Sequence, residues 1–306
     1  MAKRTFIEEL KRQYISYLFI FLPFALFLVF VVFPTIASFV MSFTEYDIFH
    51  KAKFIGLENY KNIIFNDARF RIAMWNTVIY VVVVNPIGIA LAVVVAVAID
   101  QKIKFKNFFK GVLFLPTVTS IVATSVMWKW LYAGSKYGLI NYFILMKLGL
   151  KPIDWLMSPT WTLPAIMIMS IWAGLGYNVI LFLAGLQTIP HTIYEAAEVD
   201  GAGFWHRFYY ITIPLLKPTI VFVTIMSCIQ SFQVFEQIYV MTREGSGQIG
   251  GVLDSALVGV LYLYDVGFNE FQMGYASALA YVIIFIILVL TFINKTFVQS
   301  KVEYEY

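Results

Sequence analysis

The feature that most constrains this chain is a series of six long segments without Asp, Glu, Lys or Arg. They cover 160 of the 306 residues and lie at 13–44, 72–99, 111–128, 155–194, 218–235 and 271–294. A helix that spans a bilayer needs about 20 mostly apolar residues, so each segment has room for one. Their apolar residues run continuously, whereas the strands of a membrane barrel alternate. We therefore predict an all-α integral membrane protein with six transmembrane helices, near 15–43, 72–99, 112–132, 163–186, 218–241 and 274–297.

The distribution of basic residues predicts the orientation of these helices. Lys3, Arg4, Lys11 and Arg12 precede the first span, and basic flanks tend to stay in the cytoplasm. The segments then expected inside carry 12 Lys and Arg in 70 residues, against 10 in 99 for those expected outside. We expect both termini to be cytoplasmic, and three regions: a cytoplasmic N-terminal segment 1–14, a transmembrane domain 15–298 and a cytoplasmic tail 299–306.

Composition excludes several classes of function. Hydrophobic residues make up 60% of the chain and charged residues 13%, about half the charged share of a soluble domain. The net charge of +4 is spread without any basic tract longer than two residues, which argues against a nucleic-acid partner. The single cysteine, Cys228, excludes a disulfide framework, and the three widely separated histidines suggest neither a metal site nor a catalytic site. A phosphate-binding G-x-x-x-x-G-K-[ST] loop is missing, so we expect no ATP hydrolysis by that route.

The loop 187–217, between spans four and five, is the most specific part of the sequence. Thr192 can cap a short helix that runs through Glu198, and Asp200-Gly201 is a turn signal. A second amphipathic segment, Phe204–Tyr210, then leads to Pro214. Loops between membrane helices are usually short and basic, whereas this one has 31 residues and an acidic first half. We expect a helix–turn–helix at the membrane face that docks another protein.

This loop carries the E-A-A-x3-G-x9-I-x-L-P signature of permease subunits of bacterial ABC importers, with Ile213 in place of the Leu. Other segments resemble the sugar-importer branch, which includes the maltose and glycerol-phosphate permeases. Among them are Phe54-Ile-Gly-Leu-Glu-Asn-Tyr60, Leu113-Phe-Leu-Pro116 and Met273-Gly-Tyr-Ala-Ser-Ala278. The resemblance extends over about residues 14–298.

The resemblance implies a type I ABC importer permease fold in the bacterial inner membrane. It implies a second homologous permease that encloses the path, two copies of an ATPase on the cytoplasmic loops, and an extracytoplasmic binding protein that delivers a sugar. This chain would then be no enzyme and would bind no cofactor, since ATP and Mg would belong to the ATPase. The residues expected to couple the ATPase to transport are Glu195, Ala196, Ala197, Asp200, Gly201, Ile211 and Pro214.

Polar residues inside the spans are the candidates for the substrate path. Gln230, Gln233 and Gln237 have the i, i+3, i+7 spacing of one helical face. Span four offers Tyr177 and Asn178, and Glu236 is the first charge after 18 neutral residues. Such groups should face the interior of the bundle, where they either contact a ligand or bond neighbouring helices. Because the spans hold no cluster of basic residues, a neutral sugar or oligosaccharide is expected.

One other class of function fits the same residues. A self-sufficient channel or facilitator for a small polar solute also needs no charge in the membrane. The 31-residue loop argues against it, because a channel has no need of a cytoplasmic docking element.

Overall fold

The computed structural model describes residues 14–101, 104–134, 138–243 and 249–294. Helices dominate this part of the chain, and its only strands are β1 (Thr44–Glu45) and β2 (Lys53–Phe54), which pair antiparallel. Five helices are long and apolar enough to cross a membrane, and a bent pair of helices makes a sixth candidate. The described residues thus agree with the predicted all-α architecture of six spans.

One compact unit contains residues up to 66 together with 266–282. Its first span is α2 (Tyr14–Phe27), a π-helical turn η1 (Leu28–Val32) and α3 (Phe33–Met41), and none of the side chains in this span is buried. The β hairpin and α4 (Glu58–Phe65) follow. The Asn59 amide donates to the carbonyls of Ser42 and Thr44, at 2.9 and 3.0 Å, and so joins α4 to the end of α3. The last span, α14 (Met273–Asn294), begins in this unit.

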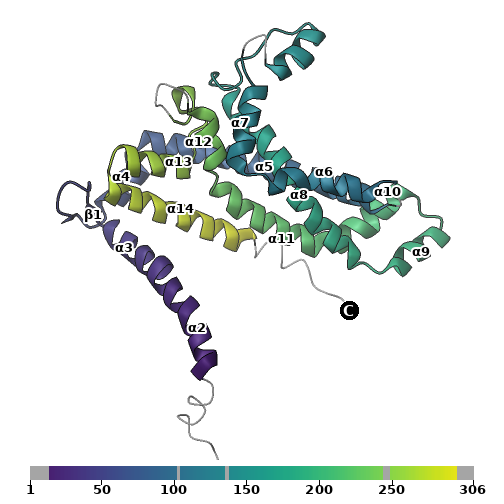
Figure 1. Cartoon of the computed structure of the whole chain (residues 1–306), viewed down its shortest axis with the longest axis horizontal. Helices are drawn as coiled ribbons and strands as arrows, with labels where there is room; N and C mark the ends of the chain where they lie inside the picture. Colours follow the sequence, from purple (N-terminus) through teal and green to yellow (C-terminus); the bar gives the residue numbers. More distant parts are fainter. Residues whose placement is uncertain (1–13, 102–103, 135–137, 244–248, 295–306) are drawn as a thin grey trace, which may run out of the picture. The chain divides into compact units, whose positions relative to one another are not determined.

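The other unit contains residues 67–265 and the rest of α14. Its long helix α5 (Ala68–Asp100) packs along α8 (Thr162–Gln187), and α11 (Ile213–Phe232) packs against both (Figure 1). Two glycines of α8 allow close helix crossings. A Cβ on Gly176 would lie 2.1 Å from the carbonyl oxygen of Leu113, and one on Gly185 would lie 2.5 Å from the hydroxyl of Thr219.

The third span is bent rather than straight. Helices α6 (Lys106–Val118) and α7 (Ile121–Leu131) meet at an angle of 99°. Pro116 cannot donate the hydrogen bond that a regular turn needs, and Thr119 and Ser120 have extended backbone angles. The Thr119 hydroxyl donates to the carbonyl of Leu115, at 2.9 Å, and satisfies one of the groups that the bend leaves free.

The fifth span differs from the predicted helix 218–241 at both ends. Residues 204–232 form a continuous helical stretch of α10 (Phe204–Arg207), the π-helical turn η4 (Phe208–Thr212) and α11. Pro214 therefore lies inside this stretch, where the first turn of α11 tolerates it. At the other end α11 stops at Phe232, and a separate helix α12 (Glu236–Thr242) begins four residues later. Tertiary contacts hold this break, because Val234 is buried and the ring of Phe235 packs against Tyr239 and Tyr264.

Short elements complete this unit between the spans. They are η2 (Asn141–Leu145), η3 (Met146–Leu148), α9 (His191–Val199), η5 (Val252–Asp254) and α13 (Gly259–Tyr264). The π-helical turn η6 (Asp265–Asn269) starts at the last residue of this unit and belongs mostly to the other one. The segment Leu253–Tyr264 contains the end of η5, a turn and α13.

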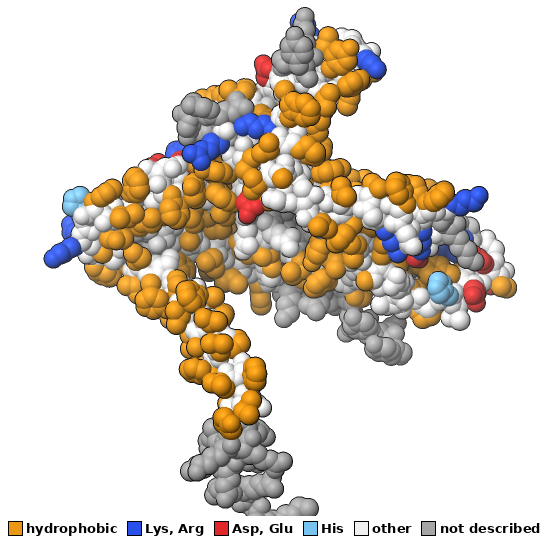
Figure 2. All heavy atoms as spheres, viewed as in Figure 1, with side chains coloured by type: hydrophobic (Ala, Val, Ile, Leu, Met, Phe, Trp, Pro, Cys, Tyr) orange, Lys and Arg blue, Asp and Glu red, His pale blue; other side chains and the backbone are white. Residues whose placement is uncertain are grey.

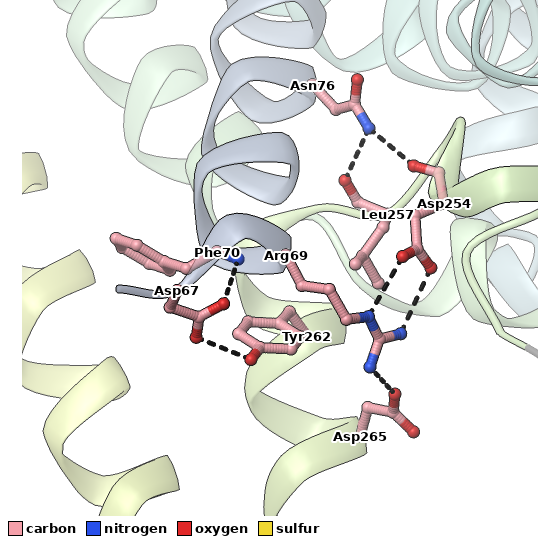
Figure 3. A network of polar contacts seen from close by, with 8 residues as sticks. All are labelled: Asp67, Arg69, Phe70, Asn76, Asp254, Leu257, Tyr262 and Asp265. Atoms are coloured by element: carbon pink, nitrogen blue, oxygen red, sulfur yellow. Dashed lines mark hydrogen bonds and ion pairs between the residues drawn. The ribbon is translucent and has the colours of Figure 1, made fainter. Parts of the chain in front are cut away.

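A polar network fixes the η5–α13 segment to the first turns of α5 (Figure 3). The guanidinium of Arg69 pairs with both carboxylate oxygens of Asp254, at 3.0 and 3.2 Å, and with Asp265 at 3.1 Å. The Asn76 amide donates to the carbonyls of Asp254 and Leu257, at 3.0 and 2.9 Å. These bonds hold the unusual backbone of Asp254, which has a φ of +57°.

Candidate functional site

A cavity of about 390 Å³ lies among the spans of the second unit. It touches α5 at Tyr80, Val84, Asn85 and Gly88, near the middle of that 33-residue helix. The bend between α6 and α7 and the break between α11 and α12 both border it, through Thr119, Ile121, Val234 and Gln237. Irregular backbone within a membrane is tolerated where it lines a cavity, and broken helices often surround transport sites.

The lining of this cavity is polar but uncharged among the described residues. It includes hydroxyls and amides from five helices: Tyr80, Asn85, Thr117, Ser170, Tyr177, Asn178, Ser227, Gln230, Ser231 and Gln237. The Ser231 hydroxyl donates to Oδ1 of Asn85 at 2.8 Å, and Nε2 of Gln237 donates to the Tyr80 hydroxyl at 3.2 Å. Thr117 Oγ1 is buried without a hydrogen-bond partner. Such a lining suits a neutral solute that carries many hydroxyls.

Four of the six residues predicted for the substrate path meet at this cavity. Tyr177 and Asn178 line it from α8, Gln230 from α11 and Gln237 from α12. Gln233 and Glu236 are exposed and are not among its lining residues. The single helical face assumed for the three glutamines does not exist, because the helix ends before Gln233 and Gln237 belongs to α12.

Sequence reasoning missed the contribution of α5 to the cavity. Tyr80 and Asn85 stand inside the uncharged segment 72–99, where only their polarity marks them. An amide facing lipid costs free energy, so Asn85 had to face the interior of the bundle. That signal was present, but the sequence did not indicate which other helix Asn85 would meet.

The loop with the E-A-A signature forms a helix, a tight turn and a second helix. Helix α9 carries Glu195, Ala196 and Ala197, and Asp200 follows it as the C-terminal cap. The amide of Gly201 donates to Glu198 O at 3.0 Å and that of Ala202 to Ala197 O at 2.8 Å. This pair of bonds is the Schellman motif, which places Gly201 in the left-handed region, with a φ of +79°.

The signature residues have different environments in this chain. Glu195, Ala196, Asp200, Gly201 and Pro214 are exposed, and Ala197 and Ile211 are half-buried. A Cβ placed on Gly201 would meet nothing within 4 Å. In Figure 2 charged side chains gather around the end of the bundle that carries α9 and α10, whereas its flank is mostly hydrophobic. The exposed face of α9 is thus available to another protein.

Comparison with known families identifies the chain. Residues 11–302 match the family described as the inner membrane component of binding-protein-dependent transport systems. The chain belongs to this family. It is a permease subunit of the bacterial inner membrane. This membership favours the importer and rejects the alternative of a self-sufficient channel.

Two relatives show how far the similarity to other permeases extends. The permease is 37% identical over 275 residues to the arabinooligosaccharides transport system permease protein of Bacillus subtilis, covering 89% of this chain and 85% of that protein. It is 38% identical over 294 residues to the lactose transport system permease protein of Rhizobium radiobacter, covering 94% and 95%.

Two solved structures share the fold of this permease. One chain of a bacterial ABC transporter that imports the acidic polysaccharide alginate superposes with a TM-score of 0.84 at 23% identity, covering 97% of this chain and 99% of that one. A chain from the alginate transporter in complex with an alginate pentasaccharide-bound periplasmic protein gives a TM-score of 0.81 at 22% identity, with 96% of each chain covered.

Proposed function

We propose that this permease imports a neutral sugar or oligosaccharide, together with a second homologous permease that completes the path. The observation that carries the proposal is the uncharged, hydroxyl- and amide-lined cavity at the middle of α5 and α8. Relatives that carry arabinooligosaccharides and lactose support a saccharide as the substrate class. A phosphorylated or acidic sugar would need basic groups, and none of the described lining residues is basic.

The features at the two ends of α5 indicate where the partner proteins bind. One end borders the E-A-A loop, since Val97 and Asp100 share a cleft with Tyr194 and Glu198 of α9. We propose that two copies of an ATPase, which bind ATP and Mg, dock on this end from the cytoplasm. The other end carries the network of Figure 3, and we propose that an extracytoplasmic binding protein delivers the sugar there. A solved relative of the same fold was crystallised with its periplasmic protein. Both chain termini would then be cytoplasmic.

Two residues of the loop, Glu195 and Ala196, have specific roles in the proposed docking of the ATPase. Glu195 is exposed on α9 and can pair with a basic residue of the ATPase; losing such a partner in a desolvated interface costs about 2–5 kcal/mol. Ala196 presents almost no side chain, so a partner backbone can approach α9 closely. Glu195→Lys should therefore abolish uptake because the ATPase no longer binds.

The test uses the complete transporter in proteoliposomes, with both permeases, the ATPase and the binding protein. The cognate binding protein is first screened for its saccharide, and that ligand is then used for uptake. Glu195→Lys should lose ATP-driven uptake and co-purification of the ATPase. Glu58→Lys, the same charge reversal on an exposed residue of α4, is the control and should keep ATPase binding. Full uptake by Glu195→Lys with normal ATPase binding would refute the docking role, and a charged ligand of the binding protein would refute the proposed substrate class.

A further inference from the structure

The coupling helix α9 is joined to the start of the fifth span by two side-chain bonds. The carboxylate of Glu198 pairs with the guanidinium of Arg207 in α10. The hydroxyls of Tyr194 and Thr212 share a hydrogen bond of 3.1 Å, and Thr212 ends the π-helical turn η4. We call these four residues the brace.

The spacing of the brace residues explains why the π-helical turn is there. Tyr194 and Glu198 are four residues apart, so they lie on one face of α9. Arg207 and Thr212 are five residues apart, and in a regular α-helix that spacing would rotate them by about 140° from each other. The π turn bonds residues five apart, and in η4 the Ile213 N–H donates to the Phe208 carbonyl. Arg207 and Thr212 thereby face the same way, and Thr212 Oγ1 lies 3.3 Å from the carbonyl of Arg207.

The brace spans an open cleft rather than a packed interface. All four of its residues line a cavity of about 380 Å³, whose floor includes Leu186 of α8 and Val97 of α5. Where side chains do not fill the space between two helices, close packing cannot hold the helices rigidly. The two bonds therefore add to the stiffness that the packing of Tyr194 and Phe208 on the neighbouring hydrophobic cluster provides.

The remaining attachments of α9 lead to a hydrophobic cluster that α5, α8 and α11 share. Tyr194, Phe208 and Ile213 pack against a hydrophobic cluster that contains Leu216 of α11. Ile189, just before α9, is buried in the same cluster. The other end of α11 lines the central cavity through Ser227, Gln230 and Ser231.

We propose that the brace makes α9 and α11 move as one body, so that a displacement of α9 by the ATPase is delivered to the central cavity. Tyr194, Glu198, Arg207 and Thr212 are positioning residues in this scheme, and the proposal rests on the docking role proposed above. A break in the brace leaves the docking face of α9 intact, with Glu195 and Ala196 still exposed. The ATPase should then still bind and hydrolyse ATP, while less of its motion reaches the cavity.

The test measures ATP hydrolysed per sugar imported by the reconstituted transporter. Glu198→Ala should raise this ratio about fivefold, the factor that corresponds to about 1 kcal/mol for a partly exposed ion pair. ATPase co-purification should stay at the parent level. The charge swap Glu198→Arg with Arg207→Glu should bring the ratio back to within about twofold of the parent. Lys106→Gln removes another partly exposed ion pair, with Asp100, that does not involve α9, and it should leave the ratio unchanged.

Spin labels test the rigid connection directly. Cysteines replace Thr192 on α9 and Leu215 on α11, both exposed, in a Cys228→Ser background. The distance between the labels should stay the same in the resting and ATP-bound transporter, and Glu198→Ala should broaden its distribution.

The two proposals fail in different ways. The proposed role of the brace is refuted if Glu198→Ala keeps the parent's ratio of ATP hydrolysed to sugar imported and the parent's distance distribution between the labels. This holds even if Glu195→Lys still loses the ATPase. A swapped pair that stays uncoupled while its ATPase binds would overturn the brace as well. Should Glu195→Lys keep the ATPase and full uptake, the docking role itself would be wrong.

Discussion

A glycine can be needed at position 201 of the coupling turn for its backbone conformation, or because the ATPase approaches too closely for a side chain. Substitutions of Gly201 separate these two reasons. Its φ of +79° is a conformation that costs other L-residues about 1–2 kcal/mol. Within this chain a Cβ on Gly201 would meet nothing within 4 Å. Gly201→Ala should therefore destabilise the free permease by only about 1 kcal/mol, all of it from backbone strain. Gly201→Asn should cost less, because Asn tolerates the left-handed region.

In the assembled transporter we expect the variants of Gly201 to rank differently in affinity for the ATPase than they rank in stability. If the ATPase approaches the turn closely, any side chain at position 201 holds the two surfaces apart, and overpacking costs about 1–3 kcal/mol. That corresponds to a loss of about 5- to 150-fold in affinity for the ATPase. Gly201→Asn should then bind the ATPase no better than Gly201→Ala, although it strains the turn less. Gly201→Asp, which adds a charge to the same surface, should abolish uptake.

The assay is the affinity of the purified permease pair for the ATPase, measured beside thermal unfolding of the permease pair alone. Gly149 provides a matched control, since it has a φ of +71° and a Cβ there would also meet nothing within 4 Å. Gly149→Ala should show the same small strain and parent affinity for the ATPase. If Gly201→Asn binds the ATPase as tightly as the parent, the glycine serves only the turn and the close approach is refuted.

Two further predictions concern the cavity and the loop after the third span. Gln230→Leu should lower sugar uptake at unchanged ATPase binding, whereas Gln233→Leu, outside the cavity lining, should transport at the parent rate; equal losses in both would show that the effect is not at the cavity. Asn141 is fully buried and makes four hydrogen bonds, so Asn141→Leu should destabilise residues 138–161 by at least about 3 kcal/mol. Hydrogen exchange of these amides measures that loss, and parent protection factors would contradict it.

The spans and the coupling turn could be read from sequence because their causes are local. Uncharged segments of sufficient length predict spanning helices whatever they pack against. The Asp200-Gly201 pair predicts a turn, because glycine is the residue best suited to a positive φ. The structure places helix α9 and the Schellman motif at these residues. The expectation that Thr192 caps the helix is wrong, because α9 begins at His191 after Pro190 and its start has no side-chain cap bond.

The cavity could be predicted only in part, because its shape depends on where two helices break. An uninterrupted helix 218–241 would have put Gln230, Gln233 and Gln237 on one face. The break after Phe232 instead depends on contacts of Phe235 with Tyr239 and Tyr264. Tyr264 lies 29 residues further along the chain, so no local pattern contains this information. The π turn at 208–212 also involves a residue outside the local sequence, because the Thr212 hydroxyl shares a hydrogen bond with that of Tyr194.

The two broken spans also suggest how motion at one end could change the cavity. Helix α11 runs unbroken for 20 residues, about 30 Å, from the brace to Phe232. Beyond the break, α12 is held separately: it packs on α7, and the ammonium of Lys129 donates to the carbonyl of Arg243 at 3.0 Å, just after the end of α12. Cations are stabilising at this end of a helix. Both helices bond to α5, α11 through Ser231 to Asn85 and α12 through Gln237 to Tyr80. Because the break separates α11 from α12, a shift of α9 can still move Gln230 relative to Gln237. The distance between these two amides across the cavity would then change with the state of the ATPase, and a continuous fifth span would not permit that.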